Sequence, residues 1–164
     1  MCFLIHAFVH YLSYCSNIKG VINGLKAVIP AIKNTVGEEG PMGSVVVNSS
    51  VMGSVVIGPK SAGAGIYSAS KAFVNSLVET AAVENAPRIR VNSVLPGLVK
   101  TNIMNVDDDT YHNIGKSMQP LYGRPGKASE IASLVHYLLS DAASFISGTN
   151  IKADGLFSLS GAGI

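Results

Sequence analysis

Charged residues and cysteines are both scarce in this sequence. Charged side chains make up 13% of the 164 residues and hydrophobic side chains 48%, which excludes a disordered chain and predicts one globular domain with a buried core. The net charge is only +2 and the Lys and Arg residues are dispersed, so no electrostatic footprint for nucleic acid is present. Cys2 and Cys15 form neither a CxxC motif nor a zinc-ligand spacing, which favours a reduced, cytoplasmic setting.

The first sixteen residues form an apolar and aromatic leader, residues 1–16. This leader is shorter than the roughly 18 apolar residues that indicate a membrane helix, and it lacks the basic start and small-residue cleavage site of a signal peptide. His6 and His10 have the spacing of two metal ligands on a helix, but no third ligand accompanies them. We therefore expect neither a membrane span nor a metal site.

The chemistry is expected around Tyr67 and Lys71, which are four residues apart and share one face of a helix. A free tyrosine loses its proton near pH ~10, and a neighbouring cation favours the phenolate form. The pair is therefore a candidate proton donor and acceptor near neutral pH. Because this spacing also arises by chance in many helices, the flanking segments decide how it is interpreted.

Two flanking segments have the pattern of parallel strands. Residues 43–50 pass from β-branched residues into a small polar loop, and residues 88–97 end in the turn Pro96-Gly97. A strand, a helix from Tyr67 and a second strand make a parallel crossover unit. Since open parallel sheets bind ligands beyond the carboxyl ends of their strands, we expect Ser50, Tyr67 and Pro96-Gly97 on one rim.

These motifs resemble the short-chain dehydrogenase/reductase family over about residues 17–154. The segments that match are Asn17-Ile18-Lys19-Gly20-Val21, Asn48-Ser49-Ser50, Tyr67-Ser68-Ala69-Ser70-Lys71, residues 91–101, Gly123-Arg124-Pro125-Gly126 and Asp154-Gly155. The resemblance implies an α/β fold, namely the back half of a Rossmann-like, doubly wound parallel sheet over residues 17–155, with a tail at residues 156–164. The family's Gly-x-x-x-Gly-x-Gly turn after a first strand, which takes the cofactor pyrophosphate, is absent.

The resemblance also implies a role for each catalytic residue. Tyr67 exchanges the substrate proton, while Lys71 assists it and holds the nicotinamide ribose. Ser50 orients the substrate oxygen, and Asn17 holds a water for proton relay to the lysine. In isolation Asn17 is equally well interpreted as a helix N-cap, and Ser49 remains an alternative to Ser50.

Further residues are implied to bind the cofactor, NAD or NADP. Pro96 and Gly97 form a turn that a flat ring can approach, the Val99 backbone meets the carboxamide, and the Thr101 hydroxyl assists. The implied reaction is hydride transfer between the nicotinamide and a small-molecule carbonyl or secondary alcohol. The alternative is an inactive remnant that serves as an interaction or dimerisation module, and the sequence does not separate the two.

The remaining elements are expected from periodicity. Helices are predicted over residues 17–34, where Pro30 either kinks the helix or ends it early, over residues 67–86 and over residues 127–140, followed by a short last strand ending at Ala153. By resemblance the first two helices form a homo-oligomer. The 58–65 loop is expected to absorb an insertion, the 102–122 segment to cover the substrate, and the 44–49 strand to lie at a sheet edge prone to aggregation.

Overall fold

The computed structural model describes residue 11, residues 13–37, residue 39 and residues 42–55, 64–104 and 106–160. His6 and His10, most of the 1–16 leader and most of the 58–65 loop lie outside these described residues. The expectations made for those three features therefore stay predictions.

The described chain alternates helices and strands in the order expected for a parallel α/β fold. The elements are η1 (Ser13–Lys19), α2 (Gly20–Val36), β1 (Gly43–Asn48), η2 (Val51–Gly53), α3 (Gly65–Asn85), β2 (Ile89–Pro96), α4 (Asp108–Met118), α5 (Ala128–Leu139), η4 (Asp141–Ala143) and β3 (Asn150–Ala153). None of the helices in the described part of the chain has the length and apolar character that a bilayer span requires.

The three strands form one parallel sheet in the order β1-β2-β3. Gly43 lies opposite Ile89 in the first pair of strands, and Ser93 lies opposite Asn150 in the second. The predicted crossover unit is thus confirmed, and β1 lies at an edge of the described sheet, also as predicted. β2 is central and its first seven residues are buried, including the polar residues Arg90, Asn92 and Ser93.

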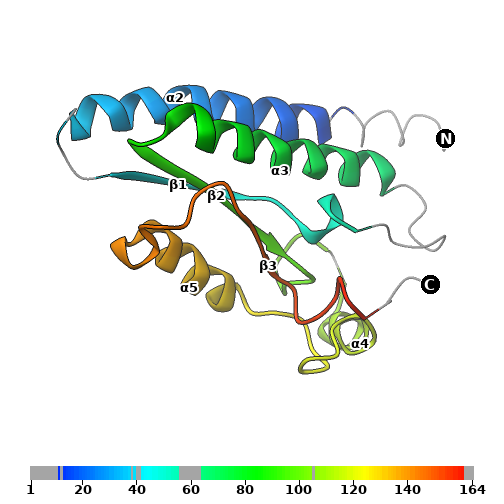
Figure 1. The fold of residues 1–164 in the computed structure, drawn as a ribbon. Helices are drawn as coiled ribbons and strands as arrows, with labels where there is room; N and C mark the ends of the chain where they lie inside the picture. The colour runs from blue at the N-terminus through cyan, green and yellow to red at the C-terminus, as the bar shows by residue number, and fades with distance from the viewer. Residues whose placement is uncertain are drawn as a thin grey trace.

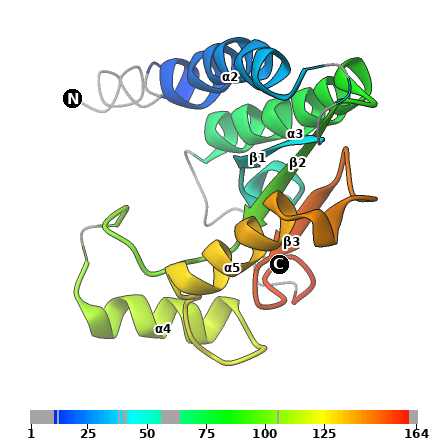
Figure 2. The same cartoon turned by 90° about the vertical axis from the view of Figure 1, so that its left-hand side faces the viewer.

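Helices cover both faces of the sheet, so that the described chain has three layers (Figures 1 and 2). α2 and α3 lie side by side on one face, and their apolar residues pack with Ile89 and Val91 of β2. α5 lies on the opposite face, where Leu138 packs against Val94. The doubly wound arrangement expected from the sequence is present, and it leaves the carboxyl ends of all three strands at one rim.

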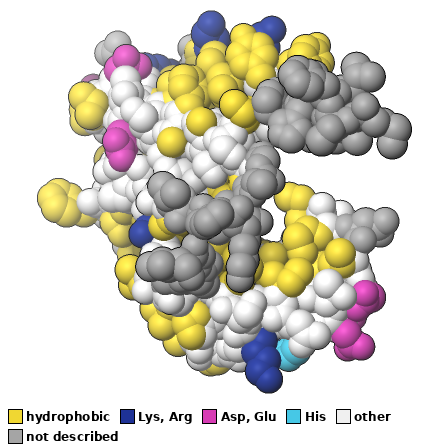
Figure 3. Space-filling model, turned by 90° about the vertical axis from the view of Figure 1, so that its right-hand side faces the viewer, with side chains coloured by type: hydrophobic (Ala, Val, Ile, Leu, Met, Phe, Trp, Pro, Cys, Tyr) yellow, Lys and Arg dark blue, Asp and Glu magenta, His cyan; other side chains and the backbone are white. Residues whose placement is uncertain are grey.

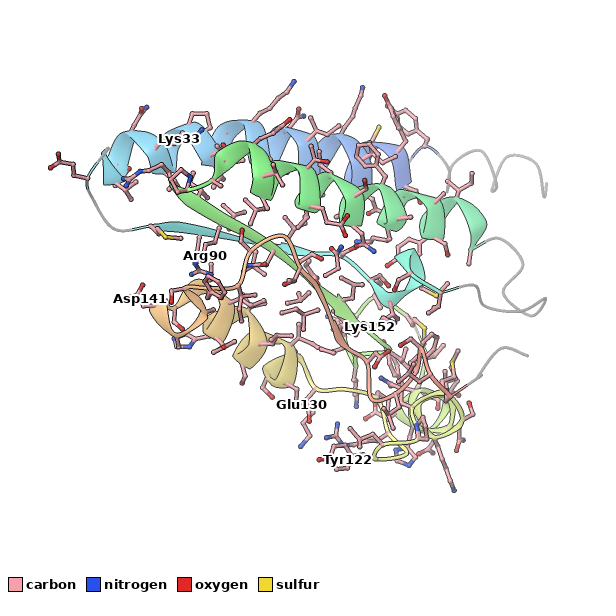
Figure 4. The ribbon with its side chains drawn as sticks, in the orientation of Figure 1. Lys33, Arg90, Tyr122, Glu130, Asp141 and Lys152 are labelled. Atoms are coloured by element: carbon pink, nitrogen blue, oxygen red, sulfur yellow. The ribbon has the colours of Figure 1, made fainter. Side chains whose placement is uncertain are left out.

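Arg90, near the start of β2, ties the sheet to the end of α5 (Figure 4). Its side chain is 3% exposed, and its guanidinium donates hydrogen bonds to the carbonyl oxygens of Leu138 at 2.9 Å and Ser140 at 3.1 Å. A helix leaves its last carbonyl groups without partners, and a buried cation at that end satisfies them and the helix dipole together. Arg90 thereby fixes where α5 ends relative to the sheet.

The structure excludes one of the two alternatives at each of two positions in the first helix. Asn17 is not an N-cap, because it lies inside the π-helical turn η1, which runs directly into α2. Pro30 does not end the helix, which continues to Val36. An interior proline removes one hydrogen bond, and α2 is long enough, with a packed apolar face, to continue past that loss.

Candidate active site

A cleft of about 960 Å³ opens at the carboxyl ends of β1 and β2. Figure 3 shows a hollow between the layer that carries α2 and α3 and the part that carries α4, with hydrophobic side chains on the α4 side. Ser50 and Met52 line the cleft after β1, Tyr67 and Lys71 line it from α3, and further walls come from the segment after β2, from α4 and from α5. A volume of this size suits a small-molecule site.

The two serines after β1 have different environments. The Ser49 hydroxyl donates a 2.6 Å hydrogen bond to Oδ1 of Asn75 on α3, so it is engaged inside the protein. Ser50 caps the short helix η2, and its hydroxyl oxygen accepts a hydrogen bond from the Met52 N–H at 3.2 Å. That bond leaves the Ser50 proton available for a ligand, since a hydroxyl both donates and accepts. This difference favours Ser50 over Ser49 as the serine that contacts substrate.

Tyr67 and Lys71 occupy consecutive turns of α3 on the face toward the cleft. The Lys71 ammonium lies 5.7 Å from the centre of the Tyr67 ring, which is within the range of a cation–π contact. The same ammonium donates a hydrogen bond of 3.4 Å to the Asn48 carbonyl oxygen at the end of β1. Partial burial lowers the pKa of the Lys71 ammonium from its ordinary value of 10.5.

Asn17 does not line the cleft but supports the turn that carries the pair. Its side-chain amide donates a 3.0 Å hydrogen bond to the Ser70 hydroxyl, which in turn donates to the Tyr67 carbonyl oxygen at 2.7 Å. Asn17 belongs to the π-helical turn η1, and such local widenings of a helix are frequent at functional sites. The structure thus joins Asn17 to the Tyr67–Lys71 turn through Ser70.

The segment after β2 forms the floor of the cleft. A Cβ atom on Gly97 would lie 2.8 Å from the Gln119 side chain and 2.9 Å from the Asp154 backbone, so a side chain does not fit there. Val99 pairs with Gly126 in an isolated parallel bridge, and the Val99 carbonyl accepts a 2.9 Å hydrogen bond from the Tyr111 hydroxyl. Pro96, Gly97, Val99 and Thr101 all line the cleft, as Ser50, Tyr67 and Lys71 do.

The approach to α5 holds the Val99 bridge in place. Arg124 contacts Glu130 through two hydrogen bonds of 2.7 and 3.0 Å, and the Lys127 N–H donates to the same carboxylate at 2.7 Å. The Arg124 guanidinium, followed by the Lys127 N–H, lowers the pKa of Glu130 to about 2. This ion pair closes the turn that contains Gly126.

Three features of the site escaped the sequence analysis. They are the Asn75 acceptor for Ser49, the Tyr111 donor to Val99, and the wall that α5 contributes through Ile131, Val135 and His136. The four-residue spacing from Lys71 to Asn75 was a usable signal, because it places both on one helix face. No cluster of His, Cys, Asp or Glu able to hold a metal ion occurs among the residues that the structure describes.

Comparisons with known proteins agree on one family. The family model described as Enoyl-(Acyl carrier protein) reductase matches residues 13–157. The short-chain dehydrogenase/reductase aba4 of Botryotinia fuckeliana is 35% identical in an alignment of 148 residues that covers 85% of this chain and 52% of that protein. The 3-oxoacyl-(acyl-carrier-protein) reductase FabG of Thermotoga maritima is 38% identical over 141 residues, which are 85% of this chain and 53% of that protein.

A solved structure shows the same fold. The aldohexose dehydrogenase AldT of Thermoplasma acidophilum, in ligand-free form, superposes with a TM-score of 0.74 and 30% identity, over 87% of this chain and 56% of that one. The chain therefore spans about half the length of the relatives it matches. On the combined basis of sequence, fold and motif placement, the chain belongs to the short-chain dehydrogenase/reductase family of oxidoreductases.

Proposed function

We propose that the cleft is the catalytic half of an NAD- or NADP-dependent oxidoreductase site that interconverts a carbonyl compound and a secondary alcohol. The observation that supports this most is that Ser50, Tyr67, Lys71 and the Pro96–Thr101 segment line the same cleft although they come from separate parts of the sequence. Family membership raises the expectation that this convergence is functional, and the roles of the individual residues are our proposal.

The residues present suit the nicotinamide end of the cofactor. Gly97 is packed so tightly behind the floor that a flat ring meets backbone rather than a side chain there. Backbone groups of successive residues point to opposite sides of an extended segment. The N–H and C=O groups of Val99 therefore both point away from Gly126, toward the side on which the Val99 carbonyl contacts Tyr111. We assign the carboxamide to the Val99 backbone and the Thr101 hydroxyl, and the ribose hydroxyls to Lys71.

The bound cofactor would supply the hydride, and the chain supplies the proton. The Tyr67 hydroxyl gives its proton to the oxygen of a carbonyl substrate, or removes it from an alcohol in the opposite direction. The Lys71 ammonium stabilises the phenolate left behind, because it lies close to the ring in a partly dry site. Ser50 donates a hydrogen bond that fixes the reacting oxygen, and Asn17 holds the helical turn that carries the tyrosine.

The second candidate is a binding module without catalysis. It is favoured by the open edge of β1 in the described sheet and by the exposed apolar residue Leu139 on α5. The open edge can pair with a strand of a partner, and the exposed apolar residue can pack against a partner helix; neither contact requires a cofactor.

Removal of the Tyr67 hydroxyl separates the two candidates. Tyr67→Phe keeps the ring and deletes only the acid/base group, so we expect turnover with ketones and NADH or NADPH to fall by about 10²–10⁴. The unfolding temperature and the cofactor affinity should stay near those of the wild type. Tyr137→Phe, on the exposed face of α5, is the matched control and should retain full activity. Equal turnover in wild type and Tyr67→Phe would refute the acid/base role of Tyr67, and the absence of turnover in both would favour the binding module.

A further inference from the structure

We infer that the substrate arm of this cleft takes an uncharged, largely apolar ketone or secondary alcohol, rather than a sugar or a phosphorylated or carboxylated compound. The inference rests on the proposed function and adds the substrate class. The substrate arm is defined as the part of the lining contributed by η2, the start of α3, the segment before α4, α4 itself and the C-terminal turn. Its residues are Ser50, Val51, Met52, Tyr67, Ile103, Met104, Ile114, Met118 and Phe157.

The chemistry of the substrate arm is almost entirely hydrophobic. Apart from Ser50 and Tyr67, its side chains are aliphatic, aromatic or thioether groups. Val51 and Phe157 are buried in one cluster, with Met52 and Met118 packed against it. Methionine is flexible and polarizable, so it adapts to an irregular apolar ligand. These residues offer a ligand apolar surface from several directions.

Part of the arm remains exposed to solvent. Ile103, which lines the cleft, is 79% exposed. Figure 3 shows the hydrophobic side chains gathered on the α4 side of the hollow. An exposed apolar surface inside a concave site is stabilised when a ligand covers it. An apolar substrate that covers this surface gains binding free energy, and a strongly hydrated substrate does not.

Polar partners for a sugar are too few. The Ser50 and Tyr67 hydroxyls are assigned to the single oxygen that reacts, and no carboxylate occurs among the described residues that line the cleft. Each sugar hydroxyl buried without a partner costs about 1–3 kcal/mol. One structural neighbour is named as an aldohexose dehydrogenase. The apolar substrate arm predicts that this chain prefers a different class of substrate from the one in that name.

Anionic substrates also find no unassigned Lys or Arg among the described residues that line the cleft. Lys71, the basic side chain nearest the reacting groups, is assigned to the ribose, and His136 lies on the α5 wall. Lys100 near the entrance pairs with Asp108 at 2.6 Å. A phosphate or carboxylate in the substrate arm would therefore be desolvated without a cation beside it, which is unfavourable.

Binding of a homologous series tests the substrate class without requiring turnover. We propose calorimetric titration of the chain with cyclohexanone and its 4-methyl, 4-ethyl and 4-propyl derivatives, with D-glucose as the polar comparison. If each added CH₂ is buried in the arm, affinity should rise about fourfold per carbon. D-Glucose should show no saturable binding at the same concentrations. A flat series, or glucose binding as tightly as the 4-propyl ketone, would overturn the inference.

Two methionine variants locate the binding. Met104→Gln places an amide of similar length in the substrate arm, and we expect it to remove most of the rise along the series. Met42→Gln makes the same change at an exposed position outside the cleft and should keep the full rise. An unchanged series in Met104→Gln would show that the ketones bind elsewhere, and the inference would fail.

Turnover of sugars or charged carbonyl compounds with a flat series would refute the substrate class alone. A rising series without turnover would count against the proposed function instead.

Discussion

Lys71 lies half-buried between α3 and the end of β1, where its ammonium donates a long hydrogen bond to the Asn48 carbonyl. Burial disfavours the charged form, so the pKa of this group is lower in the folded chain than in the unfolded one. Between the lowered value and the ordinary 10.5, the unfolded chain binds more protons, and stability therefore rises with pH across that interval. Below the interval the cost of burying the charge is present in full.

Replacing this lysine should therefore stabilise the chain while it removes function. We predict that Lys71→Met raises the unfolding temperature at pH 7 and flattens the gain in stability between the lowered pKa and about pH 10.5. Lys33→Met, on the outer side of α2 (Figure 4), should leave the unfolding temperature and its pH dependence nearly unchanged. Thermal unfolding followed by circular dichroism at several pH values measures the effect. A lower unfolding temperature for Lys71→Met at pH 7 would contradict the account.

At the scale of single residues, the sequence predicted which side chains share the cleft but not the contacts that support them. Each residue assigned from the sequence to the cofactor lines the cleft. The choice between Ser49 and Ser50 rested on resemblance, because both are loop serines and only the contact with Asn75 distinguishes them. The N-cap interpretation of Asn17 was wrong, since a π-helical turn has no sequence pattern that separates it from the start of a helix.

Among the elements, η2 positions the serine loop against α3. Gly53 ends this short helix, and a Cβ atom there would lie 2.6 Å from the Lys71 carbonyl carbon and 2.8 Å from the Ala72 nitrogen. Those neighbours are backbone atoms of a helix and cannot rotate away. The absence of a side chain at Gly53 thus sets the distance between the loop of Ser50 and the turn of Lys71.

A methyl group at position 53 should push the Ser50 loop away from the Lys71 turn. We predict that Gly53→Ala lowers the free energy of unfolding by about 1–3 kcal/mol and weakens ligand binding in the cleft, because the loop must move. Gly65→Ala, at the first residue of α3, meets no atom within 4 Å and should change stability by less than about 0.5 kcal/mol. Urea unfolding of both variants measures the difference. Equal stability of the two would show that the contact is not tight.

The helices and strands predicted from periodicity are present with boundaries shifted by a few residues, whereas α4 was not predicted. The helix expected from Tyr67 begins at Gly65, and the one expected over residues 127–140 spans Ala128–Leu139. At α4 the Asp107 carboxylate accepts a hydrogen bond from the Thr110 N–H and caps the helix. Boundaries depend on such side-chain contacts, which the apolar pattern does not encode.

For the whole molecule, the outer surface of α2 and α3 is more apolar than a solvated layer requires. Leu25 is the one buried residue within α2, which is described in full, while Val28 on the same helix is 43% exposed. On α3, Ile66 and Phe73 are seven residues apart, so they share a face, and they are 43% and 39% exposed. We propose that a second copy of the chain covers this surface, as expected from the family resemblance.

A charge in this surface should block the association. We predict that the wild-type chain sediments as a dimer or larger assembly and that Phe73→Glu shifts it to the monomer, because a carboxylate would be buried without a partner. Val106→Glu, also on an exposed apolar residue but away from α2 and α3, should assemble like the wild type. Analytical ultracentrifugation distinguishes the two. A monomeric wild type, or an unaltered Phe73→Glu assembly, would rule out this interface. The aggregation expected from the β1 edge stays a separate prediction.

Cofactor binding separates the oxidoreductase site from the binding module, because only the oxidoreductase requires it. In equilibrium titrations of the chain with NADH and NADPH, the account predicts saturable binding of at least one of them below millimolar concentration. Lys71→Met should weaken that binding by about tenfold or more, since a charged hydrogen bond is lost, and Lys33→Met should not. Absence of saturable binding of both nucleotides at millimolar concentration would contradict the assignment of this cleft to a nicotinamide cofactor.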